Sequence, residues 1–292
     1  MEFIKYNNRN IPIANSFNGA LKTNSKDTKI RYSIKFNRMA KIAKNLQKIE
    51  AKLNDILKSS KNIADQQCAF AILMMIYTGI RVGNEGSAEG YICNIKGHPS
   101  FGQKIQTFGL TTLKKEHINI VSDNEMYIEF LGKKAVEQNI KIDNSTLIRW
   151  GKHFLNKSKT EQWLLIDAST LKKFILKNIG KFQIKDFRTL KANLVAGSKI
   201  CDMQILPKPK KLKEINEEIK LISIETSNHL GNTPGICRKS YINPEIINWH
   251  IVERFPKYFS IMKEKEKKRK KRKKKLEKLK KKAEKNELLQ KT

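Results

Sequence analysis

A short stretch near the C-terminal end of the chain places a tyrosine hydroxyl close to basic side chains. The stretch reads LGNTPGICRKSY from Leu230 to Tyr241, and a helix should begin within it, because Thr233 is a good N-cap and Pro234 suits the first helical position. Tyr241 then falls in the last turn, with Arg238 three residues earlier on the same face. A phenol beside a guanidinium is a candidate nucleophile, although an isolated tyrosine near a helix end is more often a packing residue.

The whole string is more specific than its tyrosine alone. It resembles the active-site segment of type IB DNA topoisomerases of the viral and bacterial kind, in which Leu-Gly-Asn-Thr-Pro and Arg-Lys-Ser-Tyr recur together. The resemblance covers residues 31–262 and implies a helical catalytic domain that relaxes supercoiled DNA through a 3′-phosphotyrosyl intermediate. It implies no cofactor, no metal ion and no ATP.

Attack of a phenol on a phosphodiester calls for cations. The phenol has a pKa near 10, the phosphate is anionic, and the departing 5′-oxygen is a poor leaving group. Two guanidiniums can stabilise the added charge of a pentacoordinate transition state, and a lysine can protonate the leaving oxygen as general acid.

Residues that match the family's motifs occur in the family's order. Arg81, in TGIRVGNE, matches the first catalytic arginine, and Lys133, in FLGK, matches the general-acid lysine. In KDFR, Arg188 matches the second arginine and Lys185 a helper lysine. Asn232 matches the phosphate-contacting position, which is histidine in some relatives and asparagine in others. The resemblance also implies DNA contacts from Lys134, Arg238 and Lys239.

Each matched residue also has an ordinary structural alternative. Arg81 could be a cation at a helix C-terminus, and Lys133 a simple hairpin-turn lysine. Arg188 could be a surface partner of Asp186. His229 lies three residues outside the matched position and is interpreted as a helix-end or core histidine. The conjunction of four segments in the right order is what favours catalysis.

Apolar spacing predicts a mainly α fold (α+β) with one small antiparallel sheet. A three-and-four period predicts one long helix over residues 34–57, and an apolar run predicts a buried helix from an N-cap at Asp65 to about residue 80. Lys133 should lie at the tip of a hairpin. Alternation predicts strands at residues 108–113, 117–121, 126–131 and 135–142. Helices are expected again at residues 145–156, 168–179, 185–196 and 212–229.

Charge points to a polyanionic partner. The 292 residues include 60 Lys and Arg against 28 Asp and Glu, for a net charge of +32. Residues 263–292 hold 17 basic and 5 acidic side chains, so the rest of the chain is strongly basic as well. A basic body favours double-stranded DNA as the working partner over an anionic membrane.

The composition divides the chain into three parts. Residues 1–30 are expected to be a short N-terminal segment, the remnant of a clamp domain that relatives carry. Residues 31–262 form the expected catalytic domain, and residues 263–292 a lysine-rich tail with helical character. We expect this tail to grip DNA and partly replace the clamp, the alternative being a solvated solubility tail.

Several other classes are disfavoured. The four cysteines are widely spaced, with no histidine at zinc spacing, and are interpreted as reduced thiols. Paired acids that would hold Mg²⁺ and a phosphate-binding loop for ATP are both missing. No signal peptide opens the sequence, and no apolar run is long enough to span a bilayer. We therefore expect a monomeric, intracellular, DNA-associated protein.

Two rival functions remain open. A tyrosine recombinase or integrase would share the fold and the nucleophile, but recombinases generally place histidine three residues before the second arginine, where this chain has Lys185. A non-catalytic basic protein that compacts DNA would fit the composition alone.

Overall fold

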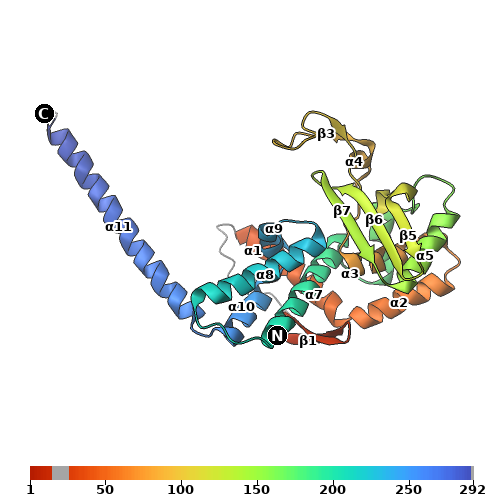
Figure 1. The fold of residues 1–292 in the computed structure, drawn as a ribbon, viewed down its shortest axis with the longest axis horizontal. Coiled ribbons are helices and arrows are strands. Elements are labelled where there is room, and N and C mark those ends of the chain that lie inside the picture. Colours follow the sequence, from red (N-terminus) through yellow and green to blue (C-terminus); the bar gives the residue numbers. More distant parts are fainter. Residues whose placement is uncertain (15–25, 291–292) are drawn as a thin grey trace.

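The protein folds into a helical body with a three-stranded sheet on one flank and a long C-terminal helix that extends away from it (Figure 1). The computed structural model describes residues 1–14 and 26–290. The mainly α fold with small antiparallel sheets expected from the sequence is confirmed. The helices are α1 Lys26–Lys44, α2 Leu46–Ser59, α3 Ile63–Thr78, α4 Glu85–Glu89, α5 Ser145–Lys157, α6 Ala168–Asn178, α7 Ile184–Gln204, α8 Leu212–Leu230, α9 Pro234–Ser240, α10 Pro244–Arg254 and α11 Tyr258–Gln290. The strands are β1 Glu2–Tyr6, β2 Arg9–Ile13, β3 Tyr91–Ile92, β4 Lys104–Ile105, β5 Ile118–Ser122, β6 Glu125–Gly132 and β7 Val136–Ile142.

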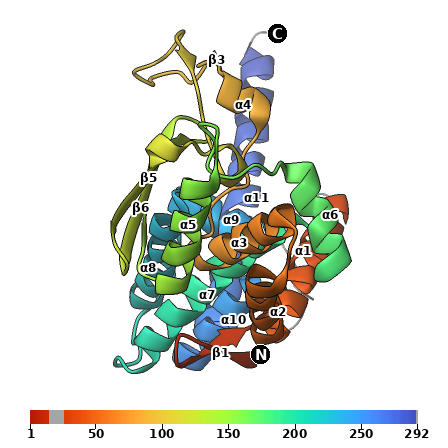
Figure 2. The same cartoon turned by 90° about the vertical axis from the view of Figure 1, so that its right-hand side faces the viewer.

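Helices α3 and α7 pack against each other at the centre of the body (Figure 2). Nearly every residue of α3 beyond Gln66 is buried, as expected for a helix that is apolar on all sides. The predicted N-cap at Asp65 was wrong, because Asn62 caps the helix by accepting a hydrogen bond from the amide of Ala64 at 2.9 Å. Helix α3 ends at Gly79, whose φ of +73° is readily available only to glycine.

The helix predicted over residues 34–57 is two helices. Helix α1 ends at Lys44 and α2 begins at Leu46, so the helix is interrupted at Asn45. The apolar residues of both helices face one core, including Phe36 in α1 and Leu53 in α2. An apolar period that continues through the break hides it from a sequence pattern.

The sheet has the order β5-β6-β7 and is antiparallel throughout. It confirms three of the predicted strands, and the pairing of Gly132 with Val136 closes the β6-β7 hairpin at the predicted place. The strand predicted at residues 108–113 was wrong. Leu110–Thr112 forms a turn of 3₁₀ helix instead, in which Thr112 N donates to Gly109 O at 2.8 Å.

The N-terminal residues form a β1-β2 hairpin that packs on α7. Ile11 is fully buried, and a Cβ built at Gly197 of α7 would lie 2.4 Å from its side chain, so α7 and the hairpin approach closely there. Arg9 adds a salt bridge to Asp202 of α7 at 2.6 Å. Residues 15–25 of the predicted N-terminal segment lie outside the described residues.

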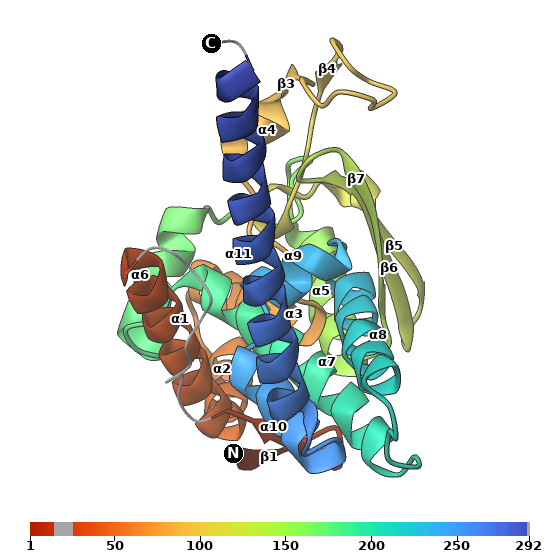
Figure 3. The same ribbon diagram turned by 90° about the vertical axis from the view of Figure 1, so that its left-hand side faces the viewer.

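Helices after the sheet follow the predictions except at their ends. Helix α7 runs to Gln204, well past the predicted end at residue 196, because its later residues help to bury a second core with α8 and α10. Helix α11 begins at Tyr258, before the predicted tail, and leaves the body beside α10 (Figure 3). Helix α11 continues across the predicted boundary between the catalytic domain, which ends at residue 262, and the tail, which begins at residue 263. This domain boundary stays a prediction.

Candidate active site

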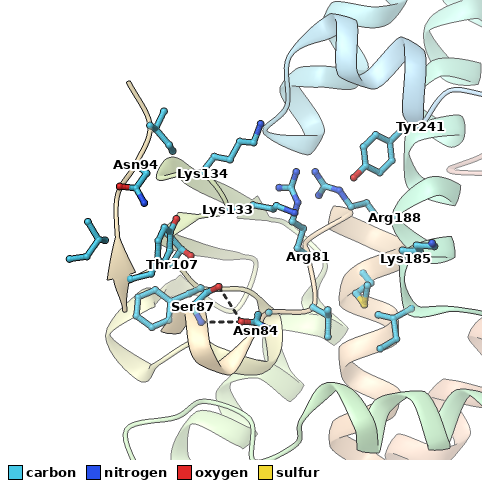
Figure 4. Close-up of a pocket in the computed structure, with 18 residues that line it drawn as sticks. Arg81, Asn84, Ser87, Asn94, Thr107, Lys133, Lys134, Lys185, Arg188 and Tyr241 are labelled. Atoms are coloured by element: carbon cyan, nitrogen blue, oxygen red, sulfur yellow. Dashed lines mark hydrogen bonds between the residues drawn. The ribbon is translucent and has the colours of Figure 1, made fainter. Parts of the chain in front are cut away.

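A cleft of about 750 Å³ lies between the sheet side of the body and the N-terminal part of α7 (Figure 4). Its lining includes five of the residues predicted to be catalytic, which come from distant parts of the sequence: Arg81, Lys133, Lys185, Arg188 and Tyr241. Lys134 also lines the cleft, whereas Arg238 and Lys239 are exposed on α9 outside it. Five cations and no carboxylate therefore face this cavity among the described residues.

Tyr241 is positioned by the short helix α9. Thr233 caps the helix by accepting from the amide of Ile236, and Pro234 is its first residue, as predicted. Tyr241 follows the last helical residue and is not inside the last turn. Its ring lies over the guanidinium of Arg188, at 5.3 Å from centroid to Cζ, and its hydroxyl points toward that group (Figure 4). The guanidinium beside the phenol is thus that of Arg188, where the sequence suggested Arg238.

The main chain on both sides of Tyr241 is held by side chains that the sequence analysis missed. Asn193 of α7, which is 1% exposed, donates to Tyr241 O at 2.9 Å and accepts from Asn243 N at 2.8 Å. Lys35 of α1 donates to the carbonyl of Ser240. A buried asparagine inside the apolar run of α7 was the available signal, because buried polar side chains need hydrogen-bond partners.

Arg188 is 4% exposed and bonds to main-chain carbonyls from two other segments. It donates to Gly79 O at the end of α3 and to Leu230 O at the end of α8. The alternative in which Arg188 pairs with Asp186 is wrong, because Asp186 is fully buried and pairs with Arg38 at 2.6 Å. Burial, and then the positive charge of Arg81, lower the pKa of Arg188 from 12.5 to about 10, so it stays charged at neutral pH.

Asn232 does not line the cleft itself but contacts Arg81, which does. Arg81 Nη2 donates to Asn232 Oδ1 at 2.6 Å, which turns the amide nitrogen of Asn232 toward the buried side of the loop. That nitrogen faces the Cys237 thiol and has no hydrogen-bond partner of normal geometry, and Arg188 Nε is likewise buried and unpaired. Two guanidiniums and two buried donors without a hydrogen-bond partner thus lie close together, which favours an anionic ligand.

Lys133 lies at the tip of the β6-β7 hairpin, as predicted, and extends toward Arg81 and Arg188 (Figure 4). It is exposed, as are its neighbour Lys134 and the first-turn residue Lys185 of α7. The two residues after Lys133 have left-handed backbone conformations, with φ of +66° at Lys134 and +56° at Ala135. His229 is an exposed helix-end residue that bonds to Glu225 O in its own helix, which settles its interpretation.

The arrangement can bind and polarise a phosphodiester. Arginine and lysine side chains line the cleft that the phenol faces, and they can neutralise the non-bridging oxygens of a phosphate. Across residues 1–14 and 26–290, no three His, Cys, Asp or Glu side chains gather as metal ligands would. No helix in the described part of the chain combines the length and apolar character needed to span a bilayer.

Comparison with known proteins identifies the family. A family profile described as "Eukaryotic DNA topoisomerase I, catalytic core" matches residues 24–240, which include Arg81, Lys133, Arg188 and Asn232 and stop one residue before Tyr241. The chain belongs to the type IB DNA topoisomerases.

Viral type IB topoisomerases are among its relatives. DNA topoisomerase I of Monkeypox virus and DNA topoisomerase 1B of Vaccinia virus (strain Copenhagen) are each 26% identical to the chain over 209 residues, which is 69% of this chain and 59% of the relative. DNA topoisomerase 1B of Acanthamoeba polyphaga mimivirus is 26% identical over 160 residues, 50% of this chain and 47% of the relative. The chain thus spans 59% of the length of the poxvirus relatives it matches.

Proposed function

We propose that this chain relaxes supercoiled DNA by cutting and resealing one strand through a covalent bond between Tyr241 and a DNA 3′-phosphate. Tyr241 Oη attacks the phosphorus, the bond from phosphorus to the 5′-oxygen breaks, and Lys133 gives a proton to that oxygen. The phenol proton leaves to solvent. The reverse step reseals the strand, so the energy of the broken bond is kept in the phosphotyrosyl link and neither ATP nor metal is consumed.

Each cation has a separate role in this proposal. Arg81 and Arg188 bind the non-bridging oxygens, and their charge offsets the charge that develops in the transition state. Asn232 Oδ1 orients Arg81, and Asn232 contacts the same phosphate once its amide nitrogen, which now faces Cys237, turns toward the cleft. Lys185, in the same cleft, adds positive potential that favours loss of the phenol proton.

One observation carries the proposal. Four segments that are far apart in the sequence bring a phenol, two guanidiniums and a lysine to one cleft, and no carboxylate lines it among the described residues. A structural arginine would be expected to pair with an acid. Arg188 instead bonds to main-chain carbonyls and keeps its charge uncompensated beside Tyr241, which favours an anionic substrate.

Double-stranded DNA is the proposed partner, and a monomer the proposed working unit. Lys134, Arg238 and Lys239 are exposed near the cleft and are proposed to contact the sugar-phosphate backbone. We accordingly place the protein in a DNA-containing compartment of a cell.

A plasmid assay tests the proposal. Supercoiled plasmid is incubated with the protein in chelator and without nucleotide, beside Tyr241→Phe and the control Tyr127→Phe, which alters a tyrosine of β6 outside the cleft. We expect relaxation by the wild type and the control and none by Tyr241→Phe. Compaction or strand exchange without relaxation by the wild type, or relaxation by Tyr241→Phe, would overturn the proposal.

A further inference from the structure

The segment of residues 91–105, here called the arm, carries none of the side chains assigned to the proposed reaction. It stands out from the body beyond the sheet, next to α4 (Figures 2 and 3). Strands β3 and β4 pair at its base. The main chain of Cys93 continues this pairing, because its N donates to Gln103 O at 2.9 Å and its O accepts from Gly102 N at 2.8 Å. Asn94 of the arm and Lys134 of the β6-β7 hairpin line the same cleft (Figure 4).

His98 of the arm touches the hairpin that carries Lys133. Its Nδ1 accepts a hydrogen bond from Ser100 N at 3.1 Å, so this nitrogen carries no hydrogen. The neutral imidazole must then carry its hydrogen on Nε2, which lies 3.3 Å from Ala135 O. The local fold of the arm thus fixes the tautomer that donates to the hairpin.

Ala135 is a place where the hairpin needs such support. Left-handed conformations at Lys134 and Ala135 cost about 1–2 kcal/mol each for residues with a Cβ, and they persist only when surrounding contacts hold them. Ala135 is 7% exposed, although Lys133 and Lys134 on its N-terminal side are exposed. A donor from outside the hairpin therefore holds the carbonyl two residues from the proposed general acid.

A second contact fixes where the arm rejoins the sheet. Phe108 N donates to Leu131 O at 2.8 Å, so the segment that follows the arm is bonded to β6 just before the hairpin tip. The ring of Phe108 also packs on His117, at 4.4 Å between centroids. The hairpin tip is consequently held on both sides: Leu131 before it bonds to Phe108, which follows the arm, and Ala135 after the exposed lysines contacts His98 of the arm.

We propose that His98 is a positioning residue that holds Lys133 in reach of the leaving 5′-oxygen. The proposal rests on the proposed function, because it assigns His98 to the proton-transfer step of that reaction. Without the bond to Ala135 O, the tip relaxes from its left-handed conformation and Lys133 Nζ spends less time at the 5′-oxygen. The attack by Tyr241 and the charge stabilisation by the arginines are unaffected.

A change of leaving group separates this role from a general loss of structure. When the bridging 5′-oxygen at the scissile phosphate is replaced by sulfur, the phosphorus–sulfur bond breaks and the sulfur leaves as a thiolate. A thiol has a pKa of roughly 8.5, so its anion departs without a proton from Lys133. A defect in proton delivery slows cleavage of the oxygen substrate alone, whereas a damaged fold slows cleavage of both substrates.

The experiment measures single-turnover formation of the covalent adduct, with saturating protein, on oxygen and sulfur duplexes made at a cleavage site mapped with the wild type. Lys133→Ala sets the scale, with an expected loss of about 10²–10⁴-fold on the oxygen substrate and little loss on the sulfur substrate. His98→Ala should lose roughly 10-fold or more on oxygen and less than about 3-fold on sulfur. His98→Gln, whose amide nitrogen can take the place of Nε2, should recover most of the rate. The control Lys96→Gln, on the same arm, should leave the ratio of the two rates unchanged.

Other outcomes overturn the inference in distinguishable ways. Equal slowing of both substrates by His98→Ala means that the contact is only structural, and no slowing means that it does not matter. Equal slowing by Lys133→Ala removes the general acid and the positioning role with it. A wild type that forms no adduct with either substrate defeats the proposed function itself.

Discussion

The wall of the cleft that carries Tyr241 and the wall that carries Lys133 are held by different kinds of contact. In the first, here called the nucleophile wall and made of Arg188, Tyr241 and the supporting Asn193, the buried side chains of Arg188 and Asn193 bond to main-chain atoms of several segments. In the second, the hairpin wall of Lys133, Lys134 and Ala135, the two lysines are exposed, Lys134 and Ala135 have left-handed conformations, and His98 holds the carbonyl of Ala135 from outside.

The difference separates two tasks of the proposed reaction. Groups that stabilise transition-state charge act best when they are fixed in a site that excludes water, because they then need no reorganisation. A proton donor must instead approach an oxygen that belongs to the DNA and that departs, so it sits on an exposed tip. Variants of the nucleophile wall should therefore affect stability and both leaving groups, and variants of the hairpin wall should affect proton delivery alone.

After the complete loss expected of Tyr241→Phe, the largest effect on both leaving groups is expected from Arg188→Ala. It removes a transition-state cation and leaves the carbonyls of Gly79 and Leu230 without this donor. Adduct formation should fall by about 10²–10³-fold or more on both oxygen and sulfur substrates, and the free energy of unfolding should drop by roughly 1–3 kcal/mol. Single-turnover assays and denaturant titration measure the two effects. A loss confined to the oxygen substrate would contradict the division between the walls.

A smaller loss is expected from Asn193→Asp. The substitution keeps the shape of the side chain but turns a carboxylate oxygen toward the carbonyls of Thr189 and Tyr241, where Nδ2 now donates. We expect adduct formation to slow by roughly 10-fold, equally on both leaving groups, with a lower melting temperature. The matched control is Asn54→Asp, because Asn54 donates only within its own helix α2, to Glu50 O. An unchanged rate for Asn193→Asp would show that the backbone of Tyr241 needs no such anchor.

The buried lysine behind the nucleophile wall should affect stability in a pH-dependent way. Burial lowers the pKa of Lys191 to about 8, partly offset by Asp143, and the ammonium also faces Tyr6 and Tyr77. Below pH 8 the folded chain carries a charge that burial disfavours, and this cost fades as pH rises toward 10.5, where the unfolded chain loses the proton as well. The wild type should therefore gain stability between pH 8 and 10.5.

Lys191→Met keeps the stem of the side chain and removes this titration. The variant should be more stable than the wild type by roughly 1–3 kcal/mol at pH 7, with the difference shrinking toward pH 10.5. Urea unfolding of both proteins at a series of pH values measures the difference. A Met variant that is less stable at pH 7, or a difference that does not change with pH, would refute the account.

The smallest effect on the chemical step is expected from removal of the lysine-rich tail after Met262. Helix α11 leaves the body and has no part in lining the cleft among the described residues, so adduct formation at saturating protein should change by less than about 2-fold. The slope of the logarithm of DNA affinity against the logarithm of salt concentration should become shallower, because fewer phosphates are neutralised. Fluorescence anisotropy at several salt concentrations measures the slope, and an unchanged slope would argue against a DNA-gripping tail.

Local motifs were enough to predict much of this site. The helix signals around Thr233 and Pro234 located Tyr241, and the turn after Gly132 located Lys133, because both depend on neighbouring residues alone. The partners of Arg188 could not be predicted in this way. They are main-chain carbonyls of two remote segments, and any residue type can supply a carbonyl.

Contacts that depend on tertiary packing were missed for the same reason. Asn193 and His98 act on the main chain of Tyr241 and Ala135, which lie 48 and 37 residues away in the sequence. The break at Asn45 was hidden by an apolar period that continues across it. The alternation at residues 108–113 suggested a strand, but Thr112 instead bonds to Gly109 O within a tight turn, and Thr111 bonds to Val82 O in a remote segment.

Identification of the covalent link tests the central claim most directly. Protein is trapped on end-labelled duplex DNA, the adduct is digested with a protease, and the peptide that carries nucleotide is sequenced by mass spectrometry. The account predicts that the DNA 3′-end is attached to Tyr241 in the peptide that follows Lys239. Attachment of a 5′-end, or of any other residue of the chain, would contradict it.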